Sequence, residues 1–250
     1  MQISADRVQQ EAKGMSMPRR AKPKSVDRTV RVKSSGAKPR ADKKSSSEAE
    51  VSRANILAVA TEEFSAKGLS GGRVDEIAER TNTSKRMIYY YFGSKEGLYQ
   101  AVLEKCYANV RQIDTSLDLD SMSPTNALRQ LVRVTFDFHN TDPDFVRLVM
   151  NENIHKGAHI GQVSSIKARA KAVISMLQRL IDRGVAAKVF RVDLDPVEVH
   201  MTISALCFYN VSNRYTFGRV FQRDMGSPGE LARRRETVVD IVERWCRGEH

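Results

Sequence analysis

The chain is 250 residues long, and its 41 Lys and Arg against 30 Asp and Glu give a formal net charge of +11. This length suits one small and one larger domain rather than a single minimal module. Its three cysteines, Cys106, Cys207 and Cys246, are too widely spaced for a disulfide framework or a CxxC metal or redox motif. Because the N-terminus lacks a signal-like apolar run and no stretch is apolar for long enough to cross a bilayer, we expect a cytoplasmic protein.

The N-terminal segment differs in composition from the rest. Residues 1–50 contain 13 Lys and Arg against 6 Asp and Glu, so most of the excess positive charge lies there. Residues 1–47 contain no Phe, Trp, Tyr or Leu and bury too little apolar surface to offset the entropy of ordering. We therefore predict a disordered basic tail over residues 1–47. Such a tail either adds salt-dependent affinity for a polyanion or is only a solubilising extension, and both alternatives stay open.

A first amphipathic helix is predicted over about residues 48–67. Apolar residues recur at helical spacing between Ile56 and Phe64, with Glu62 and Glu63 expected on the opposite, solvent side. Gly68 stands where a helix C-cap would lie. A domain is thus expected to begin at residue 48.

A helix, a tight turn and a second helix follow. Residues 73–80 predict a short helix with Val74, Ile77 and Ala78 as its buried side. Residues 81–83, Thr-Asn-Thr, predict a turn because Asn tolerates left-handed dihedrals, and Ser84 is a favourable N-cap for a helix ending near residue 92. This spacing is typical of a helix-turn-helix.

The two faces of that third helix differ in chemistry. Ser84, Ile88 and Phe92 share one face, while the other carries cationic and phenolic side chains, Lys85, Arg86, Tyr89 and Tyr90. Lysine and tyrosine suit phosphate contacts, and arginine suits base edges in a major groove. The alternative is a solvated basic face on an ordinary helix.

The segment IYYYFGSKEGL adds a family resemblance. Its Ile88, Tyr89, Phe92, Lys95 and Leu98 match the Leu-Tyr-x-x-Phe-x-x-Lys-x-x-Leu pattern of the TetR family of bacterial regulators, and the similarity extends over residues 53–98. The resemblance implies an N-terminal DNA-binding domain over residues 48–98. It also implies an all-helical ligand-binding and dimerisation domain over residues 99–250.

Carried over residue by residue, the resemblance implies specific DNA contacts. Tyr89 and Tyr91 are expected at the backbone, and Lys95 at a phosphate, where the start of a fourth helix capped by Ser94 already favours an anion. Two departures from the family are Thr81-Asn82-Thr83 in the turn, where Ala-Gly-Val is common, and Arg73, where Thr is common. The full set of expected DNA contacts is Arg73, Ser84, Lys85, Arg86, Met87, Tyr89, Tyr90, Tyr91 and Lys95, with Lys85, Arg86, Met87 and Tyr90 nearest the bases.

The remaining sequence predicts helices and no sheet. The fourth helix continues past Val102, and others are expected at residues 124–140, from 143 to about 155, and 162–183, the last ending at Gly184. An irregular connection over residues 190–195 follows. No stretch alternates strictly between apolar and polar residues for long enough to predict a sheet.

Two C-terminal helices are the expected dimer interface, at residues 196–217 and 228–247. The first is apolar around much of its circumference, more than one core face needs. The resemblance implies that both helices pair with their copies in a four-helix bundle. A homodimer would present two recognition helices to a palindromic site in double-stranded DNA.

A small-molecule effector is expected in the C-terminal domain, and no cofactor. The candidate residues mix apolar and polar character in the middle helices: Phe136, His139, Phe145, Met150, Asn151, Met176, Phe208 and Tyr209. Aromatic and Met side chains with few polar groups suit a mostly apolar or aromatic ligand, and an inward Arg147 would indicate a carboxylate. The alternative for each residue is plain core packing. The effector is expected to act by tilting the fourth helix and so changing the spacing of the recognition helices.

Other functions have weaker sequence support. Glu152, His155 and His159 have a spacing open to metal ligation, but Gly157 interrupts the helix, and capping and packing are the preferred interpretation. No Walker loop, GxSxG motif or Rossmann glycine pattern is present, so no enzyme is expected. The remaining alternative is a DNA-binding protein of the same fold controlled by a protein partner or by no ligand. A closed internal hydrophobic cavity would favour the sensor, whereas a solid core with an exposed apolar patch would favour that alternative.

Overall fold

The computed structural model describes residues 40–116 and 118–247, so the predicted tail up to residue 39 lies outside the described residues. The described chain is helical apart from short connections. The helices are α1 (Arg40–Gly71), α2 (Val74–Arg80), α3 (Lys85–Phe92), α4 (Lys95–Ser116), α5 (Pro124–Thr141), α6 (Pro143–Ile154), the 3₁₀ helix η1 (Ile160–Gln162), α7 (Ser164–Ala186), α8 (Pro196–Ser212), α9 (Arg214–Phe221) and α10 (Pro228–Cys246).

Helix α1 begins earlier than predicted. It starts at Arg40 rather than near residue 48, so the predicted start of this helix is too late. Extending an existing helix adds one hydrogen bond for each residue fixed, without a new nucleation cost. The predicted end of the helix near residue 67 agrees better with the structure. Gly68 interrupts the helix with a φ of 66°, and one further turn continues to Gly71.

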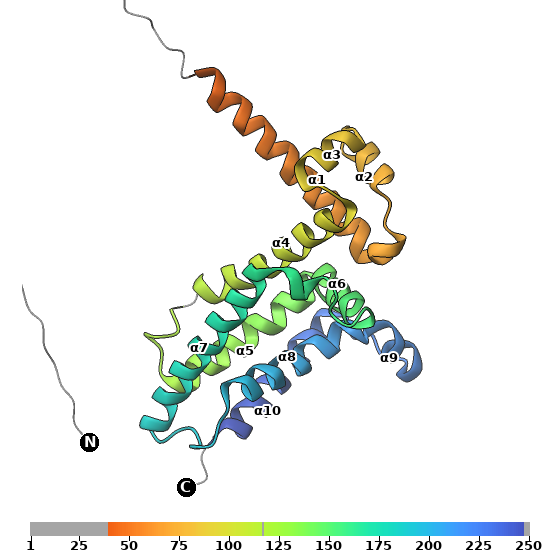
Figure 1. The fold of residues 1–250 in the computed structure, drawn as a ribbon. Helices are drawn as coiled ribbons and strands as arrows, with labels where there is room; N and C mark the ends of the chain where they lie inside the picture. The colour runs from red at the N-terminus through yellow and green to blue at the C-terminus, as the bar shows by residue number, and fades with distance from the viewer. Residues whose placement is uncertain (1–39, 117, 248–250) are drawn as a thin grey trace, which may run out of the picture. The chain divides into compact units, whose positions relative to one another are not determined.

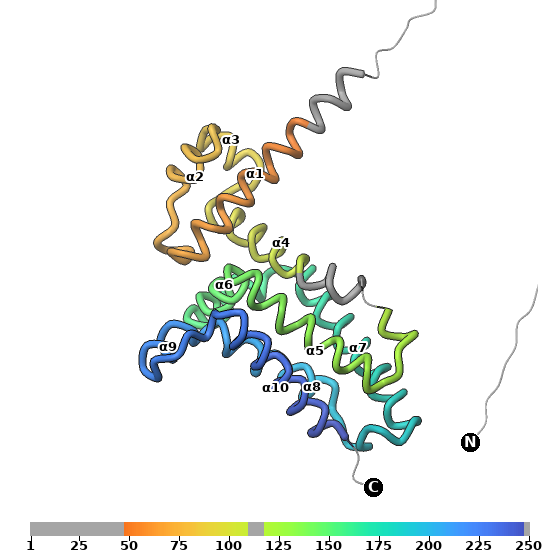
Figure 2. The backbone as a smooth tube through the Cα atoms, turned by 180° about the vertical axis from the view of Figure 1, so that it is seen from behind, coloured from red at the N-terminus to blue at the C-terminus, as the bar shows by residue number. Residues whose placement is uncertain are grey.

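Helices α5, α7, α8 and α10 lie side by side as a bundle, seen from opposite sides in Figures 1 and 2. Helix α5 packs against the other three, and α6 packs against α8. Their buried side chains form one hydrophobic cluster that includes Leu128, Phe136, Ile203 and Val242. The bundle therefore has its own core, as a separate sensing region requires.

A second hydrophobic cluster joins helices α1, α2 and α3 to the C-terminal helices. It contains Ile56, Phe64 and Ile88 from the first helices, Leu98 from α4 and Leu148 from α6. Residues from Asp42 onward form one unit. The packing is thus continuous across the domain boundary predicted near residue 98.

Two predicted boundaries are wrong, and each has a local cause. Helix α7 continues through Gly184 to Ala186, because Gly184 allows close packing: a Cβ there would lie 1.9 Å from the Phe190 ring. The helix predicted over residues 196–217 is two helices divided at Asn213, whose backbone leaves helical geometry with a φ of −105° and a ψ of 4°.

The described part of the chain contains neither a sheet nor a helix suited to cross a membrane. Its one isolated β-bridge pairs Phe190 with Arg247 and forms no sheet. No described helix combines the length and the apolar character that crossing a bilayer requires.

Candidate nucleic-acid interface and internal cavity

Helices α2 and α3 form the predicted helix-turn-helix. The turn contains Asn82 with a φ of 49°, the left-handed conformation that Asn accepts readily. Ser84 caps α3, since its hydroxyl accepts the Met87 N–H at 3.2 Å. Ile88 is completely buried and anchors α3 to the first cluster. A short helix is thereby held through a cap and a single apolar side chain.

The outer face of α3 is cationic and phenolic. Lys85 and Arg86 are exposed, Tyr90 is 79% exposed, and Met87 and Tyr89 are exposed to 39% and 40%. Tyr91 and Phe92 are half-buried, and the Arg53 guanidinium lies 5.2 Å from the centre of the Phe92 ring. The side chains assigned to bases are therefore on the accessible side of the helix, and Tyr91 is turned partly towards the core.

Lys85 is not a free cation. Its ammonium group lies 2.5 Å from the Asp75 carboxylate on α2, and both side chains are about half exposed. A water-exposed pair of this kind contributes little to stability. The pair holds the Lys85 ammonium group in place and lowers the net positive charge of the outer face of α3.

The connection between α1 and α2 depends on a buried carboxylate. Glu63, predicted on the solvent side, is only 4% exposed. It accepts the Arg73 backbone N–H at 3.0 Å at the start of α2 and pairs with Lys67 at 2.9 Å. The prediction for Glu63 was wrong because the unpaired backbone N–H groups at the start of α2 favour a carboxylate, which the preceding helix α1 supplies. The Arg73 side chain itself is exposed and lies 3.7 Å from Glu76.

The start of α4 explains a glycine and a lysine of the IYYYFGSKEGL segment. Ser94 caps the helix by accepting the Gly97 N–H at 3.0 Å. A Cβ on Gly97 would lie 2.1 Å from the Phe92 carbonyl oxygen, so no other residue fits without movement of the backbone. The Lys95 ammonium group donates to the Ser70 carbonyl oxygen at 3.4 Å, which places a cation at this helix start beside the end of α1.

A cavity of about 260 Å³ lies among α4, α5, α6, α7 and α8. Its walls are mainly apolar, with His139, Arg169, His200, Thr135 and Ser204 as polar groups. The complete lining is Tyr107, Leu131, Thr135, His139, Phe145, Val149, Ile166, Arg169, Ala170, Val173, Met176, Leu177, His200, Ile203, Ser204 and Phe208. An apolar hollow with a few polar groups suits a small molecule.

His139 is a neutral hydrogen-bonding group in this wall. Its Nδ1 lies 2.7 Å from the Thr135 carbonyl oxygen, so Nδ1 carries the proton and Nε2 is left as an acceptor. Burial lowers the pKa of His139 below its ordinary value of 6.5, and this outweighs the bond to Thr135, which favours the charged ring. Its ring packs edge-on against Phe145 and Phe208.

Comparison with known proteins identifies the family. Residues 56–102 match the model for bacterial regulatory proteins of the tetR family, and residues 124–242 match the tetracyclin repressor-like C-terminal domain. The HTH-type transcriptional repressor NicS of Pseudomonas putida is 34% identical over 200 residues, which cover 80% of this chain and 94% of NicS. The chain belongs to the TetR family. It is accordingly a DNA-binding transcriptional regulator.

Other TetR-family proteins share the fold and parts of the sequence. The HTH-type transcriptional activator FasR of Mycolicibacterium smegmatis is 33% identical over 142 residues, covering 54% of this chain and 62% of FasR. A solved transcriptional regulator from Streptomyces coelicolor has a TM-score of 0.60 at 26% identity, over 78% of this chain and 98% of that one. A tetR-family regulator from Rhodococcus RHA1 has a TM-score of 0.61 at 19% identity, over 80% and 98%.

Half of the predicted effector residues line the cavity of this TetR-family chain: His139, Phe145, Met176 and Phe208. The others lie elsewhere. Phe136 is buried in the bundle core, Met150 is exposed, Asn151 bonds to the Arg147 carbonyl oxygen, and Tyr209 lines a different pocket. Arg147 pairs with Asp144 at 3.2 Å and does not line the cavity. A shift of one residue along a helix turns a side chain by about 100°, which is enough to move it from cavity to core or surface.

Arg169 and His200 were missed by the sequence analysis. Arg169 lies on α7 between Ile166 and Val173, which both line the cavity, so the helical period through these apolar residues could have indicated it. His200 lies on α8 among apolar neighbours and has no comparable local signal. These two residues add a cationic and a titratable group to a cavity that was predicted to be almost apolar.

Glu152 has a structural role instead of the metal-binding alternative considered for it. It is buried and accepts the backbone N–H groups of His159 at 3.1 Å and Ile160 at 2.9 Å, and its other oxygen lies 3.1 Å from His159 Nδ1. Although burial raises the pKa of Glu152, these bonds outweigh it and hold the pKa below its ordinary value. His155 is exposed, and no cluster of potential metal ligands is found among the described residues.

Two helices connect the cavity to the DNA-binding helices. Tyr107 on α4 lines the cavity, and the expected tilt of that helix stays a prediction. Helix α6 was not foreseen in this role. It contributes Phe145 and Val149 to the cavity, while its Asp144 accepts the Ser65 hydroxyl of α1 at 2.9 Å. A change in the cavity wall therefore has a direct route to α1.

Proposed function

We propose that this chain is a transcriptional repressor that binds a palindromic operator as a homodimer and releases it when a small molecule occupies the α4–α8 cavity. The observation that carries the proposal is the geometry of α3. Its cap and the buried Ile88 orient Arg86 and Tyr90 outward, on a helix of the right size for a major groove. Repression is inferred from the resemblance to NicS, whereas FasR is named an activator.

Dimerisation is supported by an unpartnered apolar row on α8. Val197 and Met201 are more than half exposed and lie one turn apart on the same side of the helix. On α10 only Ile241 is a large exposed apolar residue among those described, because Val238, Val239 and Val242 belong to the chain's own core. We therefore place most of the apolar contact between copies on α8, with a smaller part for α10 than the sequence suggested.

The cavity supports control by a small molecule over control by a protein partner. A hollow with apolar walls gives a compact ligand a place to be buried, whereas a protein-controlled relative needs none. Arg169 and the free Nε2 of His139 favour a ligand that has an acidic or hydroxyl group on an apolar or aromatic body. Such a ligand is expected to shift α4 and α6 together and so alter the spacing of the two α3 helices.

Arg86→Ala tests the reading function. A binding site is first selected from random duplexes with the full chain, and affinity is then measured for that site and for a scrambled duplex. If Arg86 reads a base, the variant loses about 1–3 kcal/mol on the selected site and little on the scrambled one. Lys95→Ala should weaken both duplexes alike, because its expected contact is a phosphate.

Arg244→Ala is the matched control, since it removes an exposed cation of α10 that pairs with Asp240. It should leave the ratio of the two affinities unchanged. An Arg86→Ala variant whose preference for the selected site equals that of the parent chain would show that α3 does not read bases through this residue.

A further inference from the structure

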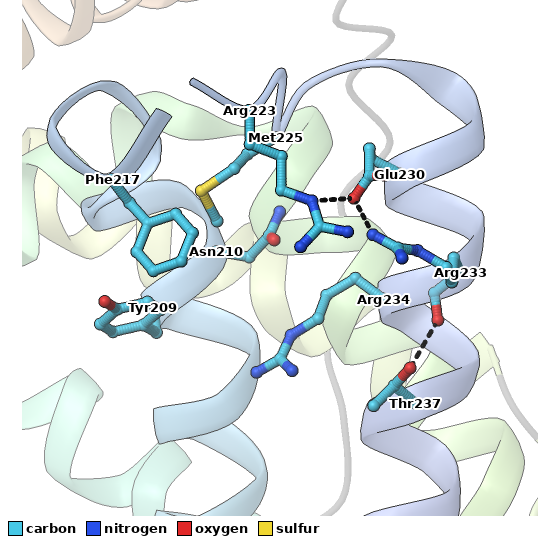
Figure 3. A pocket seen from close by; sticks show the side chains of 9 residues that line it. All are labelled: Tyr209, Asn210, Phe217, Arg223, Met225, Glu230, Arg233, Arg234 and Thr237. Carbon is cyan, nitrogen blue, oxygen red and sulfur yellow. Dashed lines mark hydrogen bonds and ion pairs between the residues drawn. The ribbon is translucent and has the colours of Figure 1, made fainter. Parts of the chain in front are cut away.

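A second pocket lies among α8, α9 and α10, and Figure 3 shows it from close by. Its volume is about 370 Å³, and it shares no lining residue with the effector cavity. Helix α8 is a wall of both: Ser204 and Phe208 face the cavity, and Tyr209 and Asn210 face this pocket. The lining is Tyr209, Asn210, Phe217, Arg223, Met225, Glu230, Arg233, Arg234 and Thr237.

The pocket contains three arginines and one carboxylate. Glu230 lies between two of them, with Arg223 Nε at 3.1 Å from its Oε2 and Arg233 paired with the same oxygen. Arg234 has no ion pair or side-chain hydrogen bond among the described residues. In Figure 3 its side chain extends from α10 across the pocket towards α8. One carboxylate thus serves two guanidinium groups, and the third has no anionic partner in the described chain.

A fourth arginine lies next to this pocket and is also short of acceptors. Arg214 Nη2 donates to Asn140 Oδ1 at 2.7 Å, and its Nε is buried without a hydrogen-bond partner in the described chain. The same Asn140 oxygen accepts Asn210 Nδ2 at 2.9 Å, and Asn210, which lines the pocket, is only 2% exposed. A buried donor without an acceptor is costly, so this region favours additional negative charge.

An apolar wall faces the arginines. The rings of Tyr209 and Phe217 pack edge-on with centres 6.2 Å apart, and Met225 completes this side of the pocket. Aromatic and Met side chains next to guanidinium groups suit a ligand with one apolar and one anionic end. Inorganic ions alone would leave the apolar wall unused.

From these observations we propose that the α8–α10 pocket binds a small organic anion, a carboxylate or phosphate on an apolar body, at a site separate from the effector cavity. Arg234 is the principal anion contact, with Arg223 beside it. The ligand would touch α8, α10 and the loop between α9 and α10 together. It would therefore link α10 and this loop to α8, which also lines the effector cavity.

Calorimetric titration of the full-length chain tests the site. Phenyl phosphate is titrated in chloride buffer, with phenol and inorganic phosphate in parallel. We expect saturable phenyl phosphate binding at the α8–α10 pocket that remains in Arg169→Gln, weaker binding of inorganic phosphate there, and no Arg234-dependent binding of phenol. Arg234→Gln should weaken phenyl phosphate binding about tenfold or more, as expected for loss of a charge-assisted contact.

Two variants with the same charge change are controls. Arg244→Gln alters an exposed arginine of α10 outside the pocket, and Arg169→Gln alters the effector cavity. Arg244→Gln should bind phenyl phosphate like the parent chain, and Arg169→Gln should lose only binding in the effector cavity and keep the binding that depends on Arg234. If Arg234→Gln does not fold, Arg223→Gln gives the same expectation, since Arg233 still pairs with Glu230.

Three results would overturn the proposal. The first is the absence of saturable phenyl phosphate binding. The second is a loss in Arg169→Gln or Arg244→Gln that equals the loss in Arg234→Gln, which would indicate the effector cavity or general charge. The third is dissociation of an assembled dimer by Arg234→Gln in sedimentation experiments, because the pocket would then be a contact between copies.

Discussion

The reading helix and the effector cavity place their polar groups in opposite ways. On α3 the polar groups face water and one buried side chain, Ile88, fixes the helix to the core. In the cavity the apolar groups surround the space, and a neutral His139 and Arg169 are the main polar features. The first arrangement suits a polyanion that meets exposed cations, whereas the second suits a compact molecule taken out of water.

This contrast indicates where each function is sensitive to change. An exposed contact on α3 can be lost with little effect on folding, but its anchor cannot. In the cavity a change at a single wall residue affects packing and recognition together, since the same side chains perform both. Helix α6 is in contact with both regions, because it borders the cavity and its Asp144 bonds to Ser65 of α1.

Ile88→Ala is expected to have the largest effect. Truncation of this fully buried side chain should lower the free energy of unfolding by about 2–5 kcal/mol and remove specific DNA binding, because α3 loses its anchor. Urea denaturation followed by circular dichroism gives the first quantity, and anisotropy of a labelled duplex gives the second.

Tyr90→Ala is the matched control on the same helix. Tyr90 is mostly exposed, so its loss should change stability by less than about 0.5 kcal/mol while DNA affinity still falls. Equal destabilisation by both variants would contradict the proposed division of α3 into an anchored and a free face.

The sequence predicted the reading helix closely because its determinants are local. The Ser84 cap, the turn at Asn82 and the spacing of Ile88 act within a few residues of one another. Glu63 was misplaced because its partner, the Arg73 N–H, follows the end of its helix. The approach of α2 and α3 that pairs Asp75 with Lys85 was likewise not foreseen from spacing alone.

The cavity was predicted only in part because its lining comes from five helices. Apolar periodicity indicates which face of a helix is buried, but not whether that face meets core or open space. Phe136 and His139 illustrate this: both are buried on α5, yet only His139 borders the cavity. Asn213, where α8 ends, was overlooked because a change of backbone conformation at one residue leaves no break in the apolar pattern.

A pH series tests the neutral state of His139. Burial lowers its pKa in the folded chain below 6.5, with His200 acting in the same direction and Asp142 and the Thr135 carbonyl opposing. Between the lowered pKa and 6.5, the unfolded chain binds the proton more readily than the folded chain does. The free energy of unfolding should therefore decrease as the pH falls through this interval.

His139→Gln keeps a hydrogen-bonding group but does not titrate, so the decrease should become smaller in this variant. The comparison is made by urea denaturation at several pH values between 5 and 7.5, and the expected difference is smaller than the effect of Ile88→Ala. Parallel pH profiles for the parent chain and the variant would show that the ring is not held neutral by the cavity.

The smallest predicted effect concerns the pairing of Lys85. Asp75→Asn should free this cation and raise affinity for random duplex DNA by at most about fivefold at low salt, as expected for an exposed pair worth roughly 0.2–1 kcal/mol. The gain should disappear as salt is added, because it comes from a phosphate contact.

Asp240→Asn makes the same change in net charge at the exposed pair with Arg244 on α10. If both variants gain affinity equally, the effect belongs to net charge and Asp75 does not restrain the reading face. If only Asp75→Asn gains, the carboxylate on α2 limits non-specific binding by competing with phosphate for Lys85, and part of the discrimination by α3 then resides in a residue that touches no DNA.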